Sequence, residues 1–135
     1  MLRIGLIGYG AWGAHHARVI AAHPRVTFAA IAARTEATTA KARAEHPSCR
    51  VCTDYRELLA QDLDAVVVVL PSHLHHEVGR AVLSSNRHLL LEKPMTLSVP
   101  HCDDLIALAQ AKNRVLALGH EMRLSSLWGK VKELL

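Results

Sequence analysis

The sequence predicts an α/β domain with a doubly wound parallel sheet of about six strands and helices on both faces. Three observations lead to this fold class. Short apolar runs alternate with helix-like segments along the chain, which is typical of parallel α/β domains. The run DAVVVVLP (64–71) contains four consecutive valines, which indicates a strand buried on both faces. Right-handed crossovers between such strands place helices on both sides of the sheet.

The expected strands are short runs rich in Val, Ile, Leu and Ala. In chain order they cover residues 2–8, 25–33, 50–53, 64–71, 88–91 and 114–120. Several of the expected helices begin at a residue whose side chain can cap the first turn: Thr35, Asp54, Ser72 and Ser98. The helices cover residues 11–22, 35–45, 54–61, 74–84, 98–112 and 125–135.

Composition and charge limit the class of protein. The 135 residues are 50% hydrophobic and 21% charged, which suits one soluble domain with a proper core. The net charge of +4 is mild and is not interleaved with aromatic residues, so no nucleic-acid or membrane partner is expected. No apolar run approaches the ~20 residues of a membrane span, and the N-terminus enters the first strand without a signal peptide. A cytoplasmic protein is expected.

The cysteines and histidines do not predict a metal or redox site. The chain has three cysteines, and an odd number makes a disulfide framework unexpected. Cys49 and Cys52 form a CxxC, but a redox CxxC normally opens a helix, and these two fall in an expected strand, where they face opposite ways. Several histidines could gather at one edge of the sheet, yet zinc needs three or four convergent ligands at defined spacing. These histidines are His73, His75, His76, His88, His101 and His120.

A glycine turn joins the first strand to the first helix, in the pattern Gly8-x-Gly10-x-x-Gly13. Gly8 allows a tight turn, Gly10 lets a diphosphate approach the main chain, and Gly13 lets the helix pack closely on the sheet. The start of the helix then offers N–H groups and partial positive charge to the diphosphate. In this context the pattern predicts a Rossmann-type dinucleotide site. It includes the residues between the glycines: Tyr9, Ala11 and Trp12.

The tip of the second strand bears on which dinucleotide binds. An NAD site usually has Asp or Glu there to hold the ribose 2′-hydroxyl, whereas this chain has Arg34 and Thr35. Arg34 with the Thr35 hydroxyl can hold a 2′-phosphate or stack on adenine. This arrangement favours NADP, with NAD as the alternative.

The segment Glu92-Lys93-Pro94 places two charges directly after the apolar run 88–91. Ligands in an open parallel sheet bind at the carboxyl ends of the strands. Lys93 is therefore expected at the edge of the sheet where a nicotinamide ring would lie, rather than in the core.

With these features, essentially the whole chain resembles the glucose–fructose oxidoreductase/inositol dehydrogenase family. The resemblance rests on the glycine turn, on Glu92-Lys93-Pro94 following Pro71-x-x-x-His75, and on GHEMR (119–123). It implies that Lys93 is catalytic, binding or polarising the substrate hydroxyl beside the nicotinamide. It also implies that the loop of Pro71 and His75 lines the cofactor site, and that Glu92 orients the loop and the ribose. In a dry site beside a cationic ring, the ammonium form of Lys93 would be disfavoured.

One position departs from the family. Two residues after Gly119 the family commonly has an amide, where this chain has Glu121. An extra carboxylate there would alter the contacts with cofactor or substrate. Arg123 is nevertheless retained as a candidate cofactor ligand.

The resemblance covers only the cofactor-binding half of such an enzyme. We expect residues 1–123 to form the NAD(P)-binding domain and residues 124–135 to form a helix that leads towards a C-terminal substrate domain. In the family, that second domain supplies the Asp and His that complete proton transfer. The helix carries an apolar stripe that should pack on this domain or on another copy of the chain: Leu127, Val131, Leu134 and Leu135.

The expected function is therefore NAD(P) binding in an oxidoreductase that transfers hydride between nicotinamide and a sugar, polyol or related hydroxy compound. The chain alone is expected to be inactive. A non-catalytic module that senses NAD(P)H and docks on a partner is the alternative. A methyltransferase that uses S-adenosylmethionine would share the glycine turn but would have no use for Glu92-Lys93-Pro94. The substrate and the oligomeric state stay open.

Overall fold

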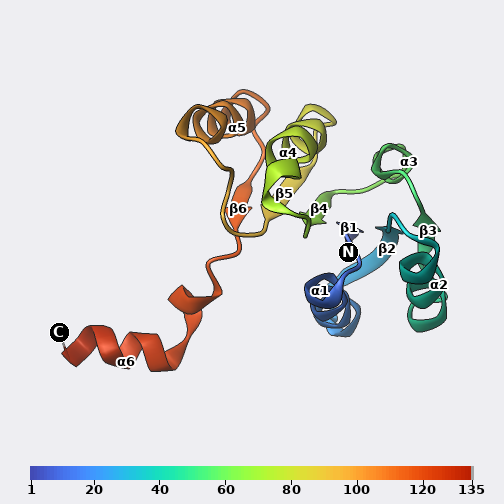
Figure 1. Ribbon diagram of the computed structural model, residues 1–135, viewed down its shortest axis with the longest axis horizontal. Coiled ribbons are helices and arrows are strands. Elements are labelled where there is room, and N and C mark those ends of the chain that lie inside the picture. Colours follow the sequence, from blue (N-terminus) through green and yellow to red (C-terminus); the bar gives the residue numbers. More distant parts are fainter. Residues whose placement is uncertain (135) are drawn as a thin grey trace.

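Six parallel strands form one sheet in the order β3-β2-β1-β4-β5-β6, in a computed structural model that describes residues 1–134 (Figure 1). The strand order reverses direction between β1 and β4, which are the two central strands. This arrangement confirms the predicted fold class. The strands are β1 (Leu2–Ile7), β2 (Val26–Ala32), β3 (Arg50–Cys52), β4 (Ala65–Val68), β5 (His88–Leu91) and β6 (Leu116–Leu118).

Helices cover both faces of the sheet (Figure 1). On one face lie α1 and α2, and on the other lie α3, α4 and α5. The helices are α1 (Ala11–Ala22), α2 (Glu36–Glu45), α3 (Tyr55–Leu59), α4 (His75–Ser84), α5 (Val99–Ala111) and α6 (Ser126–Leu134), with two short 3₁₀ turns, η1 (Ser72–Leu74) and η2 (Glu121–Leu124).

The central strands contribute to a separate hydrophobic core on each face. Successive residues of a strand point to opposite faces, so Val67 of β4 packs with α1 and α2, whereas Val66 and Val68 pack with α4 and α5. The exposed fractions of Val66, Val67 and Val68 are 0%, 6% and 0%. The uninterrupted valine run is thus explained by burial on both sides of the sheet.

Two of the four expected capping side chains cap their helices. The Thr35 side chain accepts the N–H of Thr38 in a reciprocal capping box at α2, and Asp54 accepts the N–H of Arg56 at α3. Ser98 occupies the capping position of α5, but its side chain makes no capping bond to the residues described.

The expected cap at Ser72 is wrong. Ser72 starts the 3₁₀ turn η1, and α4 begins only at His75. Within η1 the Leu74 N–H donates to the Pro71 carbonyl at 2.9 Å, and the His75 N–H donates to the Ser72 carbonyl. Because main-chain carbonyls already accept these first N–H groups, the chain enters α4 without a side-chain cap.

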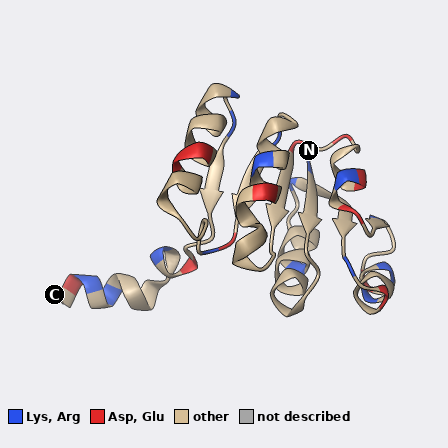
Figure 2. Cartoon of the chain, turned by 45° about the horizontal axis from the view of Figure 1, so that its top comes forward, with Lys and Arg blue, Asp and Glu red and all other residues tan. Residues whose placement is uncertain are grey.

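The last helix, α6, extends away from the sheet (Figure 1). Leu127 and Leu134 are 70% and 77% exposed, and Val131 is 38% exposed. The apolar stripe predicted for this helix is therefore uncovered as far as Leu134, and Leu135 lies outside the described residues. Basic and acidic residues are interspersed over the helices (Figure 2). Among residues 1–134, no helix has both the length and the apolar character needed to cross a membrane.

Candidate functional site

Two cavities meet at the glycine turn, at the carboxyl edge of the sheet. Their volumes are about 640 and 440 Å³, and both are lined by Gly10, Val69 and Leu70. They therefore lie on either side of the turn that starts α1, where the strand order reverses between β1 and β4. In doubly wound sheets a dinucleotide crosses this position, with one half on each side.

The three glycines of the turn meet three different surroundings. Gly8 has φ +100°, and a Cβ there would lie 2.0 Å from the Val69 carbonyl oxygen. A Cβ on Gly13 would lie 2.1 Å from the Gly8 carbonyl oxygen. A Cβ on Gly10 would have no heavy atom of residues 1–134 within 4 Å. Gly8 and Gly13 are thus required by the turn itself, whereas Gly10 leaves space open in front of the helix.

The start of α1 can receive an anion. Gly10 occupies the capping position, and no side chain in the described part of the chain makes a capping bond there. The first N–H groups of a helix lack partners within the helix and carry partial positive charge. A diphosphate in the space beside Gly10 would satisfy them.

The larger cavity lies beside the tip of β2. Arg34 is exposed at this tip and lines the cavity together with Thr35 and Pro71. The Thr35 hydroxyl oxygen accepts the Thr38 N–H at 3.2 Å, so it is engaged in capping α2. Arg34 is therefore the better placed of the two predicted 2′-phosphate ligands.

Glu92 is held by three donors in the wall of the smaller cavity. The Trp12 indole N–H donates to its Oε1 at 2.9 Å, the His16 Nε2 lies 2.8 Å from the same oxygen, and the Lys93 main-chain N–H donates to Oε2 at 3.1 Å. Burial by itself would raise the pKa of Glu92, but these hydrogen bonds outweigh burial and hold the pKa below its ordinary value. The side chain is thus a buried, ionised carboxylate.

Lys93 lines the same cavity and pairs with Glu121. Its Nζ donates to Glu121 Oε1 at 2.7 Å, and the two side chains are 47% and 41% exposed. The hydrogen bond that Lys93 donates to Glu121, and then the charge of Glu121, raise the pKa of Lys93. In this structure the carboxylate and the solvent both stabilise the ammonium form of Lys93. The expectation of a dry site beside a bound nicotinamide stays a prediction.

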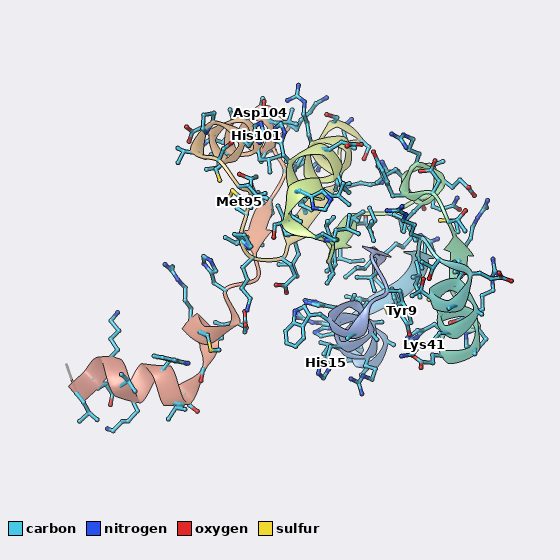
Figure 3. All side chains as sticks on the ribbon, in the orientation of Figure 1. Tyr9, His15, Lys41, Met95, His101 and Asp104 are labelled. Atoms are coloured by element: carbon cyan, nitrogen blue, oxygen red, sulfur yellow. The ribbon has the colours of Figure 1, made fainter. Side chains whose placement is uncertain are left out.

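Two of the predicted site residues turn their side chains inward. Tyr9 is 3% exposed, between α1 and α2 (Figure 3), and its hydroxyl donates to Glu45 at 2.6 Å. The ring of His75 is completely buried, with Nδ1 2.7 Å from the Pro94 carbonyl oxygen and Nε2 2.8 Å from that of Leu70. His75 therefore supports the loops around the site from behind instead of facing a ligand.

Arg123 lies apart from the other candidates. It lines a separate cavity of about 560 Å³ with Met122, Trp128 and Lys132. The two cavities at the glycine turn bring together the remaining candidates, except for His75: Gly8, Tyr9, Gly10, Ala11, Trp12, Gly13, Arg34, Thr35, Pro71, Glu92 and Lys93.

Sequence reasoning missed His16 as part of the site. His16 follows Trp12 by four residues on α1, and residues at this spacing lie on the same helix face. Both bind one oxygen of Glu92. The spacing was the available signal, but the partner lies 76 residues further along the chain.

The thiols and the remaining histidines occupy other parts of the structure. Cys49 donates to the Phe28 carbonyl at 3.1 Å, and burial raises its pKa to about 11. The rings of His76 and His101 stack 3.9 Å apart, and His76 also binds Asp104 at 2.7 Å, beside α5 (Figure 3). Within the described residues, no group of three or more His, Cys, Asp or Glu side chains is placed to hold a metal.

Comparison with known proteins agrees with this geometry. The profile of the oxidoreductase family with an NAD-binding Rossmann fold matches residues 2–120. UDP-N-acetylglucosamine 3-dehydrogenase of Acidithiobacillus ferrooxidans is 36% identical over 124 residues, which cover 90% of this chain and 38% of that protein.

Solved structures show the same fold. GenD2 from gentamicin A biosynthesis, in complex with NAD, has a TM-score of 0.93 at 32% identity, over 98% of this chain and 38% of that chain. Biliverdin reductase of Synechocystis sp. PCC 6803, in complex with biliverdin and NADP+, has a TM-score of 0.91 at 24% identity, over 98% of this chain and 42% of that chain. At this identity the likeness concerns the fold alone. The chain spans only about 38% of the length of the first curated relatives it matches.

Proposed function

Because the chain belongs to the glucose–fructose oxidoreductase/inositol dehydrogenase (Gfo/Idh/MocA) family, we propose that its NAD(P)-binding Rossmann domain serves an enzyme that transfers hydride between nicotinamide and a sugar, polyol or related hydroxy compound. The relative that acts on UDP-N-acetylglucosamine supports this substrate class. The observation that carries the cofactor half of the proposal is the pair of cavities meeting at the open Gly10.

The dinucleotide would cross the start of α1. Main-chain N–H groups after Gly10 would bind the diphosphate, the larger cavity would take the adenosine half, and the smaller cavity would take the nicotinamide half. Arg34 lines the larger cavity and favours NADP through its 2′-phosphate, with NAD as the alternative. When bound, the nicotinamide supplies the carbon that gives or accepts the hydride.

Lys93 would bind the substrate oxygen and exchange a proton with it. Glu121 raises the pKa of Lys93, so at neutral pH the side chain is an ammonium that can donate a hydrogen bond to a carbonyl or hydroxyl oxygen. During reduction of a carbonyl it would give its proton to the new alkoxide, and the reverse reaction would return the proton. We expect the chain alone to bind the dinucleotide without turnover, because it spans little more than a third of its relatives.

A sensor that docks on a partner is the second candidate. The exposed leucines of α6 favour it, because an uncovered apolar face of this kind usually meets another surface. A second domain or a second copy of the chain would cover the same face. Size measurement separates the two functions: a sensor should change its assembly state when dinucleotide is added, whereas the cofactor-binding part of an enzyme should not.

Titration with NADH and NADPH, followed by their fluorescence, tests the proposed function. Gly10→Val should lower the affinity by about tenfold or more, because its side chain would fill the space of the diphosphate. Gly129→Val is the matched control, since Gly129 also has no heavy atom of the described residues within 4 Å of a built Cβ. Circular dichroism should show both variants folded. Equal affinities of the two variants for NADH and NADPH would exclude the proposed binding position of the diphosphate beside Gly10.

A further inference from the structure

The wall of the smaller cavity carries an unbalanced set of charges. Glu92 and Lys93 line this cavity, and Glu121 reaches it through Lys93, whose Nζ lies 2.7 Å from Glu121 Oε1. One ammonium and two carboxylates are therefore clustered where the nicotinamide half would bind.

The ammonium is already matched by one of these carboxylates. Glu121 and Lys93 form an ion pair, whereas Glu92 is bound by the uncharged N–H groups of Trp12 and the Lys93 main chain. His16 Nε2 also lies 2.8 Å from Glu92 Oε1. Of the two carboxylates in this wall, only Glu121 is paired with the ammonium, so one negative charge is left over from this pair. It lies on Glu92, which is 8% exposed and thus weakly screened.

The two oxidation states of nicotinamide differ by one charge at this position. The oxidised ring is a cation and the reduced ring is neutral. The site can prefer one of the two forms only if their interaction energies with it differ. Here a negative charge attracts the oxidised ring and has no such effect on the neutral reduced ring.

We propose that Glu121 sets the preference of this site for the oxidised over the reduced dinucleotide, by neutralising Lys93 and leaving the charge of Glu92 to act on the ring. This inference rests on the proposed function, since it assumes that the nicotinamide half binds in the smaller cavity. An amide at residue 121 would leave the Lys93 ammonium to offset Glu92, and the preference would be lost.

The preference for the oxidised dinucleotide determines which direction of the reaction is favoured. Tighter binding of the oxidised form lowers the reduction potential of the bound couple, by about 30 mV for each tenfold ratio of affinities in a two-electron reaction. Carbonyl reduction is then favoured on the protein. In that direction the carbonyl carbon gains the hydride, the carbonyl oxygen gains the Lys93 proton, and the cofactor is left oxidised.

Affinity measurements on the chain test the inference without any need for activity. The dissociation constant of NADH is measured by fluorescence titration and that of NAD+ by displacement of NADH, both at low ionic strength. If the chain binds only the 2′-phosphate form, NADPH and NADP+ are used instead. Glu121→Gln should shift the ratio of affinities towards the reduced form by about three- to tenfold, the order of one charge removed at a partly solvated site.

Two further variants make the test decisive. Lys93→Met removes the opposite charge and should shift the ratio towards the oxidised form by a similar factor. Asp62→Asn removes a carboxylate that is 93% exposed before the amino end of β4, so it should leave the ratio unchanged. About 1 M salt should shrink both shifts, since charges are then screened within about 3 Å.

The inference is overturned if Glu121→Gln keeps the wild-type ratio, or if Glu121→Gln and Lys93→Met shift it in the same direction. In both cases the proposed function stands, because both oxidation states still bind. If the wild-type chain binds neither state, the proposed function fails, and the inference fails with it.

Discussion

The buried imidazole of His75 is joined to the main chain of Pro94, with Nδ1 2.7 Å from the carbonyl oxygen. The other ring nitrogen lies 2.8 Å from the Leu70 carbonyl oxygen. The His75 side chain, at the start of α4, thus connects the loop after β4 with the loop that follows Lys93. We expect these two contacts, called the His75 clamp below, to fix the position of Lys93 beside the glycine turn.

His75→Ala should lower the free energy of unfolding by about 2–4 kcal/mol, because it leaves a cavity and removes the ring that contacts the two carbonyl oxygens. Urea denaturation measures this loss. His73→Ala is the control, since His73 is exposed two residues earlier and should change the stability by less than about 0.5 kcal/mol. Equal midpoints for the two variants would show that the His75 clamp does not stabilise the fold.

The hydrogen bonds to Glu92 should make the fold sensitive to acid. They hold the pKa of Glu92 below its ordinary value of 4.5, so their stabilisation is complete above that pH and is lost as the pH falls through the lower pKa of the folded state. Glu92→Gln should be less stable than the wild type by about 1–2 kcal/mol at pH 7. This difference should narrow as the pH is lowered below 4.5.

Urea denaturation at pH 7 and at pH 3.5 measures the difference. Glu133→Gln is the control, because Glu133 is 67% exposed on α6 and its replacement should have little effect at either pH. A difference between wild type and Glu92→Gln that stays constant with pH would contradict the proposed network.

Arg34 should determine the response to the 2′-phosphate. Arg34→Asp should weaken NADPH binding by about tenfold and strengthen NADH binding, because a carboxylate repels the phosphate and accepts the ribose hydroxyls. Arg43→Asp makes the same charge change at an exposed position of α2 outside the lining of the cavity. Fluorescence titration should separate the two variants, and parallel changes in both affinities would contradict this role of Arg34.

The thiols of the CxxC should be slow to react. Burial raises the pKa of Cys49 to about 11 and also raises that of Cys52, and the reactive species is the thiolate. In a Cys102→Ser background, labelling by a disulfide reagent at pH 7 should be at least about a hundredfold slower in the folded state than in urea. Rapid labelling of the folded protein would instead support a redox role.

Periodicity and capping predicted most of the fold. The run of four valines required burial on both faces, and three of them form β4. Thr35 and Asp54 marked the starts of α2 and α3. The expected strands 64–71 and 114–120 were too long, because β4 ends at Val68 and β6 covers only Leu116–Leu118. Apolar residues beyond these ends line the cavities or loops, and sequence alone does not distinguish such positions from a strand.

The candidate site was predicted in position but not in every contact. The glycine pattern placed the turn because it is local. Gly8 and Gly10 have the surroundings that their expected roles required, whereas Gly13 is required mainly by its close approach to the Gly8 carbonyl. The inward orientation of Tyr9 and His75, and the pairing of Lys93 with Glu121, depend on partners 19 to 36 residues away. Such contacts follow from how distant segments pack, which no local pattern encodes.

The strand order also matters while the chain is being synthesised. β1 leaves the ribosome before β4 and is central in the finished sheet, where residues Ile4 to Ile7 pair on one side with Ala65–Val68. Until that later segment emerges, this side of β1 is an unpaired, apolar edge of the kind that promotes aggregation. A nascent chain stalled before β4 would therefore need a chaperone to shield it.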